Sequence, residues 1–235
     1  MEFGMIFFES LNAVRKNIVI ITPTIIASII VLIATSIIIG SDLATIDETN
    51  LEKTILVVAP RLFMISALNY FLQALSHCVT IAMAIEIENN RMCNVFDSSL
   101  TVLKRIGRIL PASILILIFL TAGLMLLILP ALYVCFAFML TFIIIMNEDI
   151  TPAMAMMKSY RAMKDNYSRS IVLFFFLSSL WITVSIINLL LGQLHYFGVI
   201  SSLFLSGLFM AFATITLLKF YRILEPNNIP LSSND

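Results

Sequence analysis

The sequence has few charged residues. Asp, Glu, Lys and Arg make up only 12% of the 235 residues, whereas 60% are hydrophobic, and mean hydropathy is +1.04. A soluble domain is about half apolar and about a quarter charged, so this chain lacks the polar surface that a water-soluble fold needs. The composition therefore argues against a soluble enzyme. It predicts an all-α, polytopic integral membrane protein whose solvent is the lipid bilayer.

Cysteine and histidine are also scarce. Cys78, Cys93 and Cys135 are odd in number and form no CxxC pair, so the sequence indicates neither a disulfide framework nor a zinc site. His77 and His195 lie in different segments without an HExxH spacing. A formal net charge of zero gives no reason to expect a nucleic-acid partner. We therefore expect no metal and no cofactor.

Motifs that carry chemistry are missing as well. The chain has no Walker loop, no GxGxxG and no GxSxG, which argues against ATP-driven transport and against an enzyme. All fourteen Asp and Glu residues fall in predicted loops or at predicted helix ends, which argues against a proton-coupled transporter. The N-terminal segment has neither a basic n-region nor a small-residue cleavage site, so it is not expected to be a signal peptide.

Six apolar runs are long enough to cross a bilayer. An α-helix rises about 1.5 Å per residue and the hydrocarbon core is about 30 Å thick, so a span needs about 20 residues. The fourth run is short, and Pro130 directly follows the third, which predicts a tight hairpin between these two spans. The predicted spans are Ile18–Ile39, Leu62–Ile85, Ile109–Leu129, Pro130–Met146, Ile171–Leu191 and Phe197–Leu218.

The distribution of Lys and Arg predicts the orientation. Only Lys53 and Arg61 fall on the side that also carries the acidic segment 41–54. The positive-inside rule therefore predicts a cell-membrane protein with both termini in the cytoplasm. The other twelve basic residues are Arg15, Lys16, Arg91, Lys104, Arg105, Arg108, Lys158, Arg161, Lys164, Arg169, Lys219 and Arg222.

Three basic segments resemble one another. They read SLNAVRKN from Ser10, SLTVLKRI from Ser99 and SYRAMKDN from Ser159, and a predicted transmembrane hairpin follows each. The pattern predicts three copies of a cytoplasmic amphipathic surface helix plus a hairpin. These pseudo-repeats cover about residues 1–88, 89–146 and 147–224 of a single transmembrane domain, 1–224, before a polar tail, 225–235. The alternative is that these segments are only positively charged loops that fix the topology.

A longer pattern runs from the third span into the third basic segment. A Pro closes an apolar run at Leu129-Pro130-Ala131-Leu132, a second apolar run and the acidic pair of Asn147-Glu148-Asp149 follow, and then come Ala155, Ser159 and Asn166. This pattern resembles a broad group of prokaryotic six-span membrane proteins, which includes uncharacterised archaeal proteins and the membrane domain of some bacterial glycerophosphodiester phosphodiesterases. The resemblance covers residues 125–175. Two departures are Ala131, where that group often has Gly, and the lack of a phosphodiesterase domain. The resemblance implies the fold rather than an activity.

The second predicted span carries a polar stripe. At 100° per residue its polar side chains fall within an arc of about 120°, with Arg61 near the outer end. One interpretation is that the stripe bonds to neighbouring helices, at about 0.6 kcal/mol per bond. The other is that it lines a water-filled path, as a pore would need. The stripe consists of Ser66, Asn69, Tyr70, Gln73, Ser76, His77 and Thr80.

Three functions follow from these patterns. The first is a homo-oligomeric pore or channel of weak selectivity, lined by the polar stripe and Arg61. The second is a membrane scaffold or accessory protein that binds partners or anionic lipid through its basic surface helices. The third is a facilitator for a small solute. The residues predicted to bind lipid headgroups or partners are Arg15, Lys16, Lys104, Arg105, Arg108, Lys158, Arg161 and Lys164.

Overall fold

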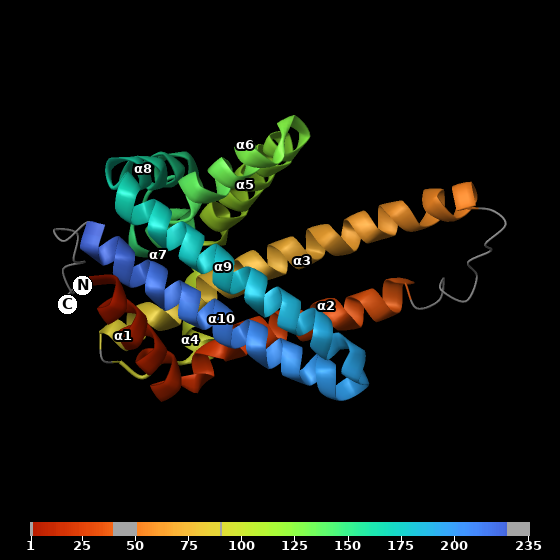
Figure 1. Cartoon of the computed structure of the whole chain (residues 1–235), viewed down its shortest axis with the longest axis horizontal. Helices are drawn as coiled ribbons and strands as arrows, with labels where there is room; N and C mark the ends of the chain where they lie inside the picture. Colours follow the sequence, from red (N-terminus) through yellow and green to blue (C-terminus); the bar gives the residue numbers. More distant parts are fainter. Residues whose placement is uncertain (1, 40–50, 90, 225–235) are drawn as a thin grey trace.

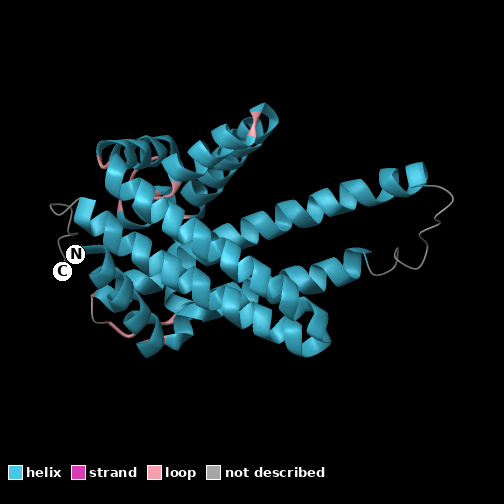
Figure 2. Cartoon of the chain, in the orientation of Figure 1, coloured by secondary structure: helices cyan, strands magenta, loops and turns pink. Residues whose placement is uncertain are grey.

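In the computed structural model, every regular element of the described residues, 2–39, 51–89 and 91–224, is a helix (Figure 2). Most of the acidic segment 41–54 and the polar tail 225–235 lie outside the described residues. The elements are α1 (Glu2–Lys16), η1 (Ile18–Ile21), α2 (Thr22–Ile39), α3 (Leu51–Glu88), α4 (Val95–Lys104), α5 (Ile106–Leu126), α6 (Ile128–Phe138), α7 (Thr141–Asn147), α8 (Pro152–Asp165), α9 (Tyr167–Leu191), η3 (Gly192–Leu194) and α10 (His195–Leu224).

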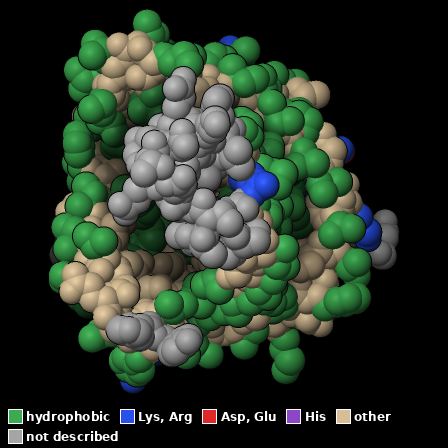
Figure 3. Space-filling view, turned by 90° about the vertical axis from the view of Figure 1, so that its right-hand side faces the viewer, with side chains coloured by type: hydrophobic (Ala, Val, Ile, Leu, Met, Phe, Trp, Pro, Cys, Tyr) green, Lys and Arg blue, Asp and Glu red, His purple; other side chains and the backbone are tan. Residues whose placement is uncertain are grey.

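Six of these helical stretches are long and apolar enough to cross a membrane, which confirms the predicted number. They are Ile18–Ile38, Ala59–Glu88, Ile106–Leu126, Ile128–Asn147, Tyr167–Leu194 and Phe197–Leu224. Large apolar side chains point outward along them; Phe63, Leu126 and Phe197, for example, are at least 70% exposed. Hydrophobic side chains also cover much of the described surface at the end opposite the termini (Figure 3). Such a surface suits lipid rather than water, so the structure is compatible with a multi-pass membrane protein.

The centre of the fold is formed by α3, α7 and α10, which pack on one another. Their contact buries Ile81 and Met83 of α3, Ile144 of α7, and Leu218 and Tyr221 of α10 almost completely. Consecutive long helices pair, with α2 along α3, α5 along α6, and α9 along α10. The three pairs diverge from the end where the termini lie (Figure 1).

The short helices α1, α4 and α8 repeat one packing pattern. Each of these helices precedes one pair in the chain and packs on the second helix of the preceding pair: α4 packs on α3, and α8 packs on α6 and α7. The first pair has no pair before it, and its short helix α1 packs on α10 of the last pair, which makes the order cyclic. In two of the pairs the first helix also packs on the second helix of the preceding pair: α2 packs on α10, and α5 packs on α3. The third pair does not follow this pattern, because its first helix, α9, packs closely on neither α6 nor α7.

The turn between the third and fourth spans differs from the prediction. We expected a boundary at Leu129 and Pro130, but α5 ends at Leu126 and the turn is at Leu127. Pro130 lies in the first turn of α6, where its missing N–H removes no helical hydrogen bond. The fourth span is also not continuous, because α6 ends at Phe138 and α7 begins at Thr141.

Gly123 lets α5 and α6 approach closely. A Cβ at Gly123 would lie 2.9 Å from the backbone Cα and N of Ala131. We expect Gly123→Ala to lower the free energy of unfolding by about 1–3 kcal/mol, because the two helices must move apart. Gly107→Ala is the control, since nothing lies within 4 Å of its Cβ position and Ala favours a helix. Thermal unfolding in detergent measures both, and equal midpoints would contradict the packing argument.

Candidate functional site

The inner part of the polar stripe on α3 is hydrogen-bonded to other helices of the chain. Its partners come from α2, α5 and α10, so the stripe joins the bundle on three sides. The bonds run from Tyr70 Oη to the Ser113 carbonyl (2.9 Å), from Gln73 Nε2 to Ser28 Oγ (3.3 Å), from Ser76 Oγ to Thr24 Oγ1 (3.3 Å), and between His77 Nδ1 and Thr214 Oγ1 (3.1 Å).

The other stripe residues have different surroundings. Thr80 is fully buried, and its hydroxyl donates to the Ser76 carbonyl of its own helix (3.0 Å). Ser66 and Asn69 lie nearer the start of α3 and are exposed on the surface of the chain. Arg61 is half-buried. The predicted pore-lining residues thus divide into an inner set that contacts other parts of the chain and an outer set that reaches the surface.

His77 lies where the three central helices meet. Besides its bond to Thr214 of α10, its ring contacts the Phe142 ring of α7 edge-on, with 6.0 Å between ring centroids. The partners Thr24, Ser28 and Thr214 were not predicted from the sequence. A signal for the first two was present, because Thr24 and Ser28 are four residues apart and share one face of a helix.

A second polar group joins the ends of α3, α7 and α10. We call Glu88, Asn147, Glu148, Tyr221 and Arg222 the terminal cluster. Arg222 contacts Glu88 through Nε (3.4 Å) and donates from Nη2 to Asn147 Oδ1 (3.0 Å). The Tyr221 hydroxyl donates to Glu148 Oε1 (2.5 Å). The sequence pattern did not predict this cluster, because its members come from three segments that are far apart in the chain.

Three of the eight predicted headgroup-binding residues bond to other parts of the chain. Arg105 donates from Nη1 to the carbonyls of Ile145 (2.7 Å) and Met146 (2.5 Å) at the end of α7. Burial, and then the nearby positive charge of Arg108, lower the pKa of Arg105, but a guanidinium stays charged. Arg108 forms an ion pair with Asp149, and Lys158 forms one with Glu148 (2.6 Å). The other five are exposed: Arg15, Lys16, Lys104, Arg161 and Lys164.

A cavity with a mixed polar and apolar lining lies at the end of the molecule that carries the terminal cluster. We call it the basic cavity; it has a volume of about 420 Å³ and lies between α1, the end of α3 and α10. Lys16, Arg91 and Lys219 line it together with one carboxylate, Glu9, which pairs with Lys219. Three cations and one anion leave the lining with a net positive charge. The amide of Asn12 adds a neutral hydrogen-bonding group.

The serines of the three similar segments are placed differently. Ser159 of α8 is fully buried and bridges the break in the fourth span: its Oγ donates to the Ala137 carbonyl (2.8 Å) and accepts from the Leu140 N–H (3.3 Å). Ser10 is equally buried, but its hydroxyl has no hydrogen-bond partner. In the second segment the fully buried serine is Ser98, not Ser99.

Two local signals mark the start of α8. The Thr151 side chain caps the helix by accepting from the Met154 N–H (3.4 Å), and Pro152 occupies the first helical position. Within the described part of the chain, no three His, Cys, Asp or Glu residues are placed to hold a metal ion. Cys78, Cys93 and Cys135 are unpaired.

Comparison with known proteins gives no relative: no protein-family model, no curated protein and no solved structure matches this chain. The resemblance to the membrane domain of glycerophosphodiester phosphodiesterases therefore stays a prediction.

Proposed function

We propose that the chain is a membrane scaffold or accessory protein that binds anionic lipid headgroups at its basic end. In this proposal the six apolar helices cross the membrane as three hairpins. The short amphipathic helices α1, α4 and α8 lie at the cytoplasmic surface. The cyclic packing of these helices, each on the second helix of another pair, supports the arrangement. The chain is not proposed to be an enzyme.

The basic cavity is the observation that carries this proposal. Lys16 of α1, Arg91 of the segment after α3, and Lys219 of α10 converge there, with Glu9 as the one opposing charge. A phosphate-bearing headgroup would supply the missing negative charge and accept several hydrogen bonds at once. The exposed Lys104 and Lys164 on α4 and α8 extend the positive charge along the same end of the molecule.

The test is lipid selectivity in nanodiscs. A basic residue near anionic headgroups contributes about 1 kcal/mol, which corresponds to about fivefold in affinity. We therefore expect Lys16→Gln and Lys104→Gln each to reduce the enrichment of phosphatidylglycerol over phosphatidylcholine by about that factor. Native mass spectrometry of the released protein counts the retained lipids.

Lys53→Gln is the matched control. Lys53 lies near the start of α3, whereas the basic cavity contacts its end, so the same loss of charge should leave the enrichment unchanged. Enrichment that is equally low in all three variants, or absent in the unaltered chain, would refute headgroup binding at the basic end.

A second candidate function is a homo-oligomeric pore or a small-solute facilitator. The exposed Ser66 and Asn69 favour it, because polar side chains on the outside of a span need a polar neighbour, which a second copy of the chain could supply. Gln73 and His77 weigh against it, since they already bond to Ser28 and Thr214 within the chain. Solute flux in proteoliposomes separates the two functions. Flux that Asn69→Leu abolishes would favour the pore, and no flux at all would exclude it.

A further inference from the structure

A groove opens in the side of the bundle between α6 and α9. Its volume is about 560 Å³. Leu132, Tyr133 and Phe136 line it from α6, and Tyr167, Phe174 and Thr183 are among the residues that line it from α9. Both walls belong to candidate membrane spans, so the groove faces the hydrocarbon region if these helices cross the bilayer.

The groove lies where the cyclic packing pattern is broken. Its equivalents in the other two pairs are the contacts of α2 with α10 and of α5 with α3, whereas α9 makes no comparably close contact with α6 or α7. Aromatic rings of α6 and α9 meet across this gap. The Phe136 ring meets Tyr167 at 5.9 Å and Phe174 at 5.7 Å, both edge-on. At this position the close helix contact of the other two pairs is thus replaced by a groove that aromatic side chains line.

The size and chemistry of the walls fit an acyl chain. From Tyr167 to Thr183 the groove follows α9 for about 24 Å, at 1.5 Å per residue, within a hydrocarbon core about 30 Å thick. The walls are mostly apolar: Phe136 is nearly buried, whereas Leu132 is 46% and Phe175 is 64% exposed toward the opening. Among the residues that the structure describes, no charged side chain lines the groove.

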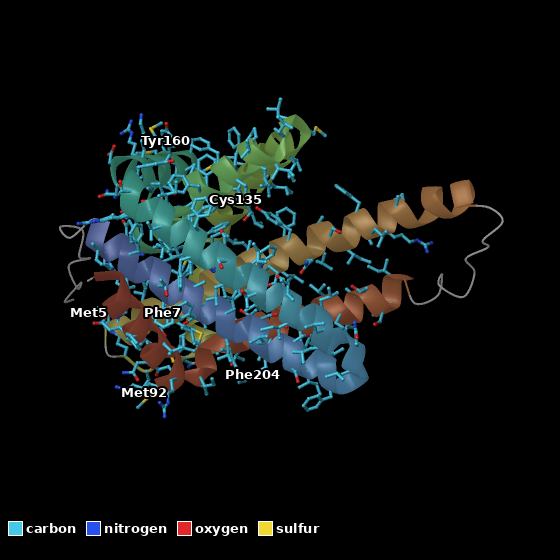
Figure 4. The ribbon with its side chains drawn as sticks, in the orientation of Figure 1. Met5, Phe7, Met92, Cys135, Tyr160 and Phe204 are labelled. Atoms are coloured by element: carbon cyan, nitrogen blue, oxygen red, sulfur yellow. The ribbon has the colours of Figure 1, made fainter. Side chains whose placement is uncertain are left out.

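The α8 end of the groove carries tyrosines and positive charge. Tyr133 interacts with Tyr160 of α8, and the Lys164 ammonium lies 5.9 Å from the centre of the Tyr160 ring. Figure 4 shows Tyr160 on the outer side of α8, with nitrogen-bearing side chains beside it. Tyrosine is enriched at the level of lipid headgroups, where one end of the ring is apolar and the hydroxyl is wet.

The charges at this corner are unbalanced. Arg161, Lys164 and Arg169 are exposed around the junction of α8 and α9, with Asp165 as the one exposed carboxylate on this stretch. The corner therefore has a net positive charge next to an apolar groove. An anionic phospholipid has the complementary order, with a negative headgroup attached to an apolar chain.

We propose that the groove between α6 and α9 holds an acyl chain of an anionic phospholipid from the leaflet that contacts α8. Arg161 and Lys164 bind its phosphate, and the tyrosines pack against the glycerol region. This inference rests on the proposed function and deepens it, since it assigns one lipid molecule to one specific site. That site is separate from the basic cavity, which is formed by α1, α3 and α10.

Filling the groove tests the proposal. Ser179 lines the groove, so Ser179→Phe should displace the chain, whereas Ser185 on the same helix does not line it and Ser185→Phe is the matched control. In nanodiscs that contain phosphatidylglycerol and phosphatidylcholine with identical chains, native mass spectrometry should show that Ser179→Phe loses one tightly bound phosphatidylglycerol and that Ser185→Phe keeps it. Arg161→Gln with Lys164→Gln should lose the preference for phosphatidylglycerol. Equal retention by the two Phe variants would overturn the groove site.

A fluorescence measurement keeps the test independent of the Phe variants. Trp181 is the single tryptophan of the chain, so Trp181→Phe with Leu132→Trp places one reporter in the groove. Phosphatidylglycerol with brominated chains, at low mole fraction, should quench this reporter more than brominated phosphatidylcholine does. Equal quenching overturns the groove site. If, in addition, Lys16→Gln and Lys104→Gln leave lipid enrichment unchanged, the proposed function fails as well, whereas a loss of enrichment in those variants leaves headgroup binding intact.

Discussion

Arg222→Met is expected to lower the free energy of unfolding by about 2–3 kcal/mol. Removing one partner of a buried ion pair costs about 3–5 kcal/mol because the other charge is left uncompensated, and partial exposure reduces this cost. The Arg222 and Glu88 side chains are 24% and 25% exposed. The change would also leave Asn147 Oδ1 without its bond from Arg222. Thermal unfolding in detergent should show a midpoint lower by roughly 5–10 °C for a chain of this size.

A double-mutant cycle separates the ion pair from other effects of Arg222. Glu88→Gln in the Arg222→Met background should cost less than Glu88→Gln alone, because the carboxylate has already lost its partner. Arg15→Met is the control for loss of a basic residue, since Arg15 is exposed. If Arg222→Met and Arg15→Met unfold at the same temperature, the terminal cluster does not stabilise the central helices.

Ser159→Ala is expected to loosen the break between α6 and α7. The change leaves the Ala137 carbonyl and the Leu140 N–H without the hydroxyl that bridges them, in a fully buried position. Each buried group left unsatisfied costs about 1–3 kcal/mol, so the unfolding midpoint should fall. Hydrogen exchange at the Leu140 amide should also accelerate, because its acceptor is gone. That amide reports on the break itself rather than on overall stability.

Ser10→Ala is the matched control for this prediction. Ser10 occupies the corresponding place in the first of the three similar segments and is equally buried, but its hydroxyl has no partner. Removing a buried hydroxyl that makes no hydrogen bond should be neutral or slightly stabilising. A loss of stability at Ser10 as large as that at Ser159 would show that the effect comes from the change in volume and not from the bridge.

Local patterns were sufficient for the number of spans and for some helix ends. Hydropathy is summed over about 20 neighbouring residues, so the six apolar runs could be read without knowing which helices meet. The start of α8 can also be read from neighbouring residues, because Thr151 and Pro152 act within one turn. The turn at Leu127 cannot be read from neighbouring residues alone, since its position depends on how closely Gly123 lets α5 approach Ala131.

The sequence by itself determined that this chain belongs in lipid, with six helices long enough to cross it and a surplus of basic residues in three similar segments. Only the tertiary structure decided what the polar residues contact. Gln73 and Ser28 are 45 residues apart, and His77 and Thr214 are 137 apart. Equally, nothing in the basic segments distinguished Arg105, which binds the end of α7, from Lys104, which is exposed. The physical reason is that hydropathy and charge act locally along the chain, whereas a hydrogen bond depends on which distant helix supplies the partner.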